Sequence, residues 1–120
     1  MQTEMSLTMP IAAGLLSHCV EEPSTLLNLL TAEQMTGLKD FIFDHLEDKD
    51  GAPEIGNLDL TFFNYEPEEQ SGSFRIHFYI NRRFCCSEVE SSRPDYVDFQ
   101  FSYTKETLYA TAHYFDWNVT

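Results

Sequence analysis

The alternation of apolar and polar residues is clearest between residues 74 and 83. Phe74 and Ile76 share one parity, whereas Arg75 and His77 share the other. Successive side chains of a β-strand point to opposite faces. The pattern therefore predicts a strand with one apolar face and one face that carries cations, an imidazole and a phenol, and this second face is a candidate for function.

Other runs downstream of residue 57 carry the same period of two and are separated by residues typical of turns. Together the runs predict strands near 58–65, 73–84, 96–104 and 107–117. A tight turn at Lys105 and Glu106 would join the last two strands. We expect these strands to form a four-stranded antiparallel sheet.

Parity assigns the side chains of the predicted sheet to two faces. The first face would be apolar, and it would include Leu58, Leu60 and Phe62 of the first strand. It would also hold the small residues Ala110 and Ala112, which leave room for a helix to lie close. The second face would carry Phe63, Tyr65, Arg75, His77, Tyr79, Asn81, Arg83, Asp98, Gln100, Ser102, Tyr109, Thr111, His113, Phe115 and Trp117.

The N-terminal half of the chain has different patterns. Residues 1–9 are polar and lack a helix cap, so we expect a loose N-terminus. A short helix is predicted to open at Pro10 and to end before Pro23. The leucine-rich stretch 24–30 would add about one helical turn.

A longer helix is predicted to begin at Thr31, because Thr31 and Gln34 have the spacing of a capping box. Apolar residues three and four positions apart then form the stripe that a helix packs against a core. The stripe consists of Met35, Leu38, Phe41, Ile42 and Leu46. Gly51 and Pro53 would end this helix.

These elements predict an α+β fold, with N-terminal helices packed on one face of a four-stranded antiparallel meander. One domain would span residues 1–120, with helices over 10–50 and the sheet over 57–118. An alternative interpretation is that the segment 11–30 covers part of the second face of the sheet, which would make the aromatic residues there ordinary core.

Charge and cysteine usage narrow the classes of partner. The chain has 20 acidic and 7 basic residues, a formal net charge of −13. Such a field repels phosphate backbones, so direct nucleic-acid binding is not expected, and it attracts basic proteins. Three cysteines, no recognisable secretion signal and no apolar run of membrane-spanning length predict a cytoplasmic protein that binds no membrane.

Motifs for metal binding do not withstand a check of their spacing. Asp48-Lys49-Asp50-Gly51 is similar to the middle of a calcium-binding loop, but that register places Leu46 and Asn57 where carboxylates are required. Cys85 and Cys86 are adjacent, so on a strand they would point to opposite faces and would not readily share a zinc ion. We expect no metal and no cofactor.

The second face combines residue types that are enriched in protein interfaces, and acids line the helix beyond it. This combination predicts a non-catalytic binding protein, an inhibitor or immunity protein that neutralises a basic partner such as a nuclease toxin. The layout is similar in outline to that of some small bacterial DNA-mimic and toxin-immunity proteins, although no motif ties the chain to them. The residues expected to bind the partner are Asp40, Asp44, Glu47, Asp48, Arg75, His77, Tyr79, Tyr109, His113 and Trp117, with Glu66, Glu68 and Glu69 as further acids.

Two alternative functions use the same face. In the first, a small-ligand-binding or enzymatic α+β domain uses His77 and His113 as acid and base. In the second, a domain without a dedicated ligand forms homo-oligomers, with the open sheet face as a dimer surface.

Overall fold

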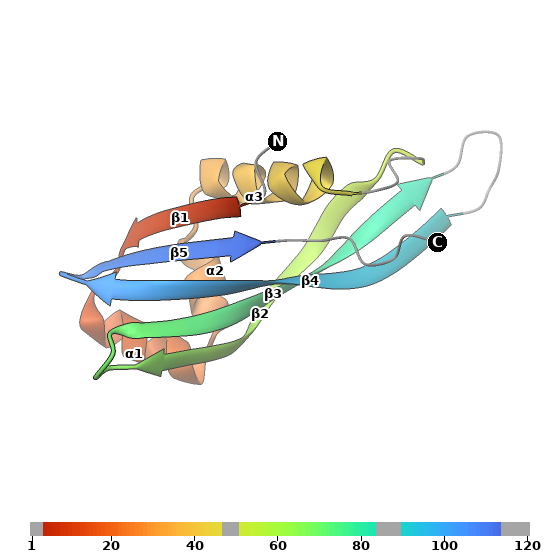
Figure 1. Ribbon diagram of the computed structural model, residues 1–120. Helices are drawn as coiled ribbons and strands as arrows, with labels where there is room; N and C mark the ends of the chain where they lie inside the picture. The colour runs from red at the N-terminus through yellow and green to blue at the C-terminus, as the bar shows by residue number, and fades with distance from the viewer. Residues whose placement is uncertain (1–3, 47–50, 84–89, 114–120) are drawn as a thin grey trace.

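The computed structural model describes residues 4–46, 51–83 and 90–113. Within these ranges the chain forms an α+β fold, a five-stranded antiparallel sheet with three helices (Figure 1). The strands are β1 (Glu4–Pro10), β2 (Glu54–Glu66), β3 (Ser71–Arg83), β4 (Glu90–Thr104) and β5 (Thr107–His113). The helices, α1 (Ala13–Glu21), α2 (Ser24–Leu29) and α3 (Ala32–Asp44), all lie between β1 and β2 in the chain.

The strand order is β1-β5-β4-β3-β2. Strands β2 to β5 therefore form the predicted antiparallel meander, and the prediction of only four strands is wrong because β1 adds a fifth. The turn between β4 and β5 lies at Lys105 and Glu106, as predicted, and both residues have positive φ values of 52° and 56°. Positive φ at both central residues is the feature of a type I′ hairpin turn.

The prediction of a loose N-terminus is wrong for residues 4–9, which belong to β1 and pair with β5. The prediction that a helix opens at Pro10 is also wrong, because Pro10 is the last residue of β1 and α1 begins at Ala13. Leu7 and Met9 share one parity and are only 4% and 5% exposed, because they pack into the core. Burial of these side chains and a ladder of backbone hydrogen bonds together hold the segment in place.

The capping box at the start of α3 is confirmed. The Gln34 backbone N–H donates to Thr31 Oγ1, and the Thr31 N–H donates to Gln34 Oε1, both at 3.0 Å. The helix ends at Asp44 instead of near Gly51. Its last turn tightens, because the N–H of His45 bonds to the Ile42 carbonyl at 3.1 Å, a spacing of three residues.

All three helices pack on one face of the sheet, where they form a single core with it (Figure 1). Leu16, Leu26 and Leu38 contribute from α1, α2 and α3, and each is at most 2% exposed. The alternative interpretation, in which the segment 11–30 covers the second face, is therefore wrong. That face is free of helices in the described structure.

Strand β2 departs from the predicted parity because it contains two bulges, one between Gly56 and Asp59 and one between Thr61 and Asn64. Each bulge adds a residue and reverses which side chains face the core. As a result Phe62, which was assigned to the core face, is 65% exposed, and Phe63, which was assigned to the open face, is 6% exposed.

Candidate partner-binding surface

The helix-free side of the sheet, which we call the open face, carries large aromatic side chains from four adjacent strands. Phe62 of β2, Tyr79 of β3, Tyr96 of β4 and Tyr109 of β5 are 40 to 65% exposed. Tyr109 is flanked on the two neighbouring strands by short polar residues, Ser102 of β4 and Thr8 of β1. The open face is therefore aromatic over β2 to β4, with Tyr109 standing apart at the hairpin end.

Arg75 lies at the centre of the aromatic region. Its Nε and Nη2 atoms donate to the two carboxylate oxygens of Asp98 at 2.7 and 3.1 Å, and its guanidinium carbon lies 3.9 Å from the Tyr96 ring centroid and 5.3 Å from that of Phe62. The hydrogen bond to Asp98 is the largest cause that raises the pKa of Arg75 above its ordinary value. The guanidinium is thus held between two rings and neutralised within the chain.

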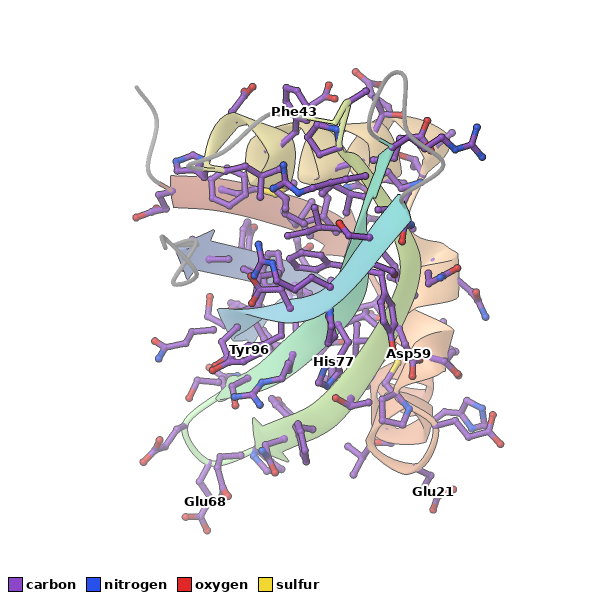
Figure 2. The ribbon with its side chains drawn as sticks, turned by 90° about the vertical axis from the view of Figure 1, so that its right-hand side faces the viewer. Glu21, Phe43, Asp59, Glu68, His77 and Tyr96 are labelled. Carbon is purple, nitrogen blue, oxygen red and sulfur yellow. The ribbon has the colours of Figure 1, made fainter. Side chains whose placement is uncertain are left out.

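His77 belongs to the same cluster (Figure 2). Its Nε2 atom lies 2.8 Å from Thr61 Oγ1, and its ring centroid lies 6.3 Å from those of both Phe62 and Tyr96. Asp59 and Tyr96 occupy the facing positions on the two neighbouring strands. We call the residues Thr61, Phe62, Arg75, His77, Tyr96 and Asp98 the Arg75 cluster.

The histidines of the enzymatic alternative come from strands that are not neighbours. His113 lies in β5 opposite Asp98 of β4, and His77 lies in β3 opposite Tyr96 of β4. Strand β4 separates the two backbones, and two strand spacings amount to about 10 Å. The register therefore gives no direct pairing of the two positions.

The predicted partner-binding residues fall into separate regions. Arg75, His77 and Tyr79 lie together on β3, and Tyr109 lies two strands away on β5. Asp40 and Asp44 are exposed on α3, beside β1 at the far edge of the sheet. Glu66, Glu68 and Glu69 lie at the β2–β3 turn, where Figure 2 places Glu68 at the tip. Glu47, Asp48 and Trp117 lie outside the described residues, as does the His113 side chain.

Sequence reasoning missed three members of the Arg75 cluster, Thr61, Phe62 and Tyr96, although Thr61 alternates with the apolar Leu60. Tyr96 shares its parity with Asp98 in the predicted strand 96–104, so the alternation was sufficient to place it on the open face. Phe62 had no such signal, because only the bulge after Thr61 turns it away from the core.

Comparison of the chain with protein-family models, with curated proteins and with solved structures gives no match. Among the residues that the structure describes, no group of three His, Cys, Asp or Glu side chains is arranged to hold a metal ion. None of the described helices has the length and apolar character required to cross a membrane. The calcium-loop motif and the pair Cys85 and Cys86 lie, at least in part, outside the described ranges.

Proposed function

We propose that the protein is a non-catalytic binding protein for a basic protein partner, acting as an inhibitor or immunity protein of an enzyme such as a nuclease. The observation that carries this proposal is the set of exposed aromatic side chains on the open face. Removal of these side chains from water in an interface would lower the free energy of the complex, whereas the isolated chain leaves them exposed.

The residue types of the open face suit a protein interface. Tyrosine, phenylalanine and arginine are enriched at interface centres, because they bury much area for few rotatable bonds. In the Arg75 cluster, Asp98 and Tyr96 already fix the guanidinium, so less conformational entropy is lost on binding. By contrast, the exposed large hydrophobic residues of the described helices, Val20 and Leu29, lie on two different helices.

Charge supports a basic partner. A net charge of −13 accelerates encounter with a cationic protein and slows encounter with nucleic acid. The acids of α3 lie beside the edge strand β1, and those of the β2–β3 turn lie at the end of that hairpin, so a partner that extends beyond the aromatic contact would meet them with its lysine and arginine residues. A nuclease presents such cations because it binds a phosphate backbone.

The test begins with identification of a partner that co-purifies with the untagged chain at low salt, followed by calorimetric measurement of its affinity. Tyr79→Ala and Tyr96→Ala are expected to weaken binding by about 30-fold each, the effect of losing an interface anchor. Val20→Ala and Leu29→Ala, which remove equally exposed apolar side chains from the helical side, serve as matched controls. Affinity is expected to fall with added salt, chiefly through the association rate.

Several outcomes would reject the proposal. If the affinity does not change with salt concentration, the negative charge is not a determinant of binding. If the tyrosine variants bind as tightly as the controls, the open face is not a determinant. A loss of activity on a small substrate in His77→Ala would favour the enzymatic alternative. If light scattering detects a dimer and Tyr96→Ala dissociates it, the homo-oligomer alternative would be favoured.

A further inference from the structure

Among the described strands, β1 pairs only with β5, so its other edge has no neighbouring strand within residues 4–46, 51–83 and 90–113. Alternate residues of an antiparallel strand direct their N–H and C=O groups to opposite sides. The Ile11 N–H donates to the Glu106 carbonyl at 2.9 Å, so odd-numbered residues of this segment face β5. Even-numbered residues face outward, as the Thr8 carbonyl shows by accepting a hydrogen bond from Gln34 Nε2 of α3 at 3.1 Å.

Ser6 is therefore the point at which the outer edge is open. Its N–H and C=O groups point away from β5, and among the described residues neither has a hydrogen-bond partner. Ser6 itself is exposed. An open edge of this kind is a template on which an extended peptide adds as a further strand.

A groove runs beside this edge, between β1 and α3, which lies alongside it (Figure 1). Its lining residues are Glu4, Met5, Ser6, Gly37, Asp40, Phe41, Asp44 and His45. Phe41 and Met5 supply apolar surface, and three carboxylates surround it. The Nε2 atom of His45 is buried there without a hydrogen-bond partner in the described part of the chain. The groove thus combines strand-pairing groups with strong negative charge.

We propose that the edge of β1 binds an extended lysine- or arginine-rich segment of the partner, which adds as a strand by pairing with the outward N–H and C=O groups of Ser6 and places its cations beside Asp40. The inference rests on the proposed function, and it specifies the part of the basic partner that is recognised. Charge selects this occupant over a second copy of the chain, because two copies would each bring a net charge of −13 to the contact.

The first test uses a short fluorescein-labelled peptide that alternates lysine with valine, and measures its anisotropy at low salt. The peptide is expected to bind, and methylation of alternate backbone nitrogens is expected to weaken binding by at least about tenfold, because it removes the donors of the added strand. Equal binding by the methylated peptide would overturn strand addition and leave only charge attraction.

The second test fills the groove without disturbing the fold. A Cβ atom added at Gly37 would meet no atom within 4 Å, and leucine is a better helix former than glycine, so Gly37→Leu is expected to fold. Gly14→Leu in α1 is the matched control, because Gly14 has equal space and lies away from the groove. Gly37→Leu is expected to lose at least about tenfold in peptide affinity, and equal affinity of the two variants would overturn the proposal.

A third variant tests the backbone directly. Ser6→Pro removes an outward N–H and no hydrogen bond to β5, and proline is tolerated at such edge positions, where Pro10 already stands. It is expected to weaken peptide binding, whereas Ser6→Ala is not.

If the purified partner binds Gly37→Leu normally but loses affinity for Tyr96→Ala, the proposed function holds and the edge site fails. If the wild-type chain dimerises and Ser6→Pro abolishes the dimer, the occupant is a second copy and the proposal is overturned.

Discussion

The two faces of the sheet use aromatic side chains in opposite ways, and adjacent residues of β3 show the difference. Phe78 points to the helices and is 0% exposed, whereas Tyr79 points to the open face and is 40% exposed. Burial of Phe78 lowers the free energy of the folded state, while Tyr79 still contacts water. Stability thus resides on the covered face, and the open face holds apolar area that folding leaves unburied.

Polar interactions are likewise buried on the covered face and exposed to water on the open face. On the covered face the Tyr103 hydroxyl donates to the Ile11 carbonyl at 2.6 Å in a buried hydrogen bond that joins β4 to the end of β1. On the open face the Arg75 and Asp98 side chains are 30% and 55% exposed. Water replaces a lost partner on the open face but does not reach the buried bond, so equivalent deletions have unequal costs.

The largest expected contrast comes from alanine at the neighbouring positions of β3. Phe78→Ala is expected to lower the free energy of unfolding by about 3 to 5 kcal/mol, because it leaves a cavity in the core. Tyr79→Ala is expected to cost less than about 1 kcal/mol. Urea unfolding followed by circular dichroism measures both. A Tyr79→Ala cost close to that of Phe78→Ala would show that the open face also carries the fold.

Removal of the Tyr103 hydroxyl sharpens the contrast for polar groups. Tyr103→Phe keeps the ring in place but leaves the Ile11 carbonyl without its donor. We expect a loss of about 1 to 3 kcal/mol in the free energy of unfolding. In the variant, amide hydrogen exchange should accelerate more in β1 than in β3, because the hydrogen bond from Tyr103 that holds the end of β1 is lost. Unchanged exchange in β1 would mean that the ladder to β5 alone secures the strand.

Alkaline pH provides a second measurement on the covered face. Burial raises the pKa of the Tyr103 phenol and of the Cys19 thiol above their ordinary values of 10.0 and 9.0. The unfolded chain therefore releases these protons at lower pH than the folded chain does. Stability is expected to be constant below about pH 9 with respect to these groups and to fall as pH rises above it. In urea titrations Tyr103→Phe should show a shallower decline than wild type.

Sequence patterns predicted the elements whose determinants are local. The capping box needs only Thr31 and Gln34, and the β4–β5 hairpin needs only its two turn residues and alternating strands. Similarly, strict alternation in 74–83 was sufficient to place Phe78 in the core and Tyr79 on the open face.

Elements that depend on distant residues escaped prediction. Strand β1 is short, and it is held by β5, whose residues lie about a hundred positions away in the chain. The alternation of Met5, Leu7 and Met9 is present in the sequence, but it was not interpreted as a strand because the polar residues between them and the missing helix cap suggested a loose terminus. The bulge in β2 places the non-glycine residue Phe62 at a φ of 54°, a conformation that propensity does not foresee. That bulge is the reason why Phe62 lies in the Arg75 cluster on the open face and Phe63 lies in the core.

The smallest expected effect belongs to the ion pair of the Arg75 cluster. Arg75→Ala and Asp98→Ala are each expected to lower the free energy of unfolding by about 1 kcal/mol or less, because exposed pairs gain little over hydration. A double-mutant cycle should give a coupling energy of about 0.5 to 1 kcal/mol that decreases with added salt. Arg75→Lys should recover less than half of it, since lysine cannot form the paired hydrogen bonds that the guanidinium makes with Asp98. A coupling above about 2 kcal/mol that salt does not reduce would make the cluster part of the folding core, and the contrast between the two faces would no longer separate stability from binding.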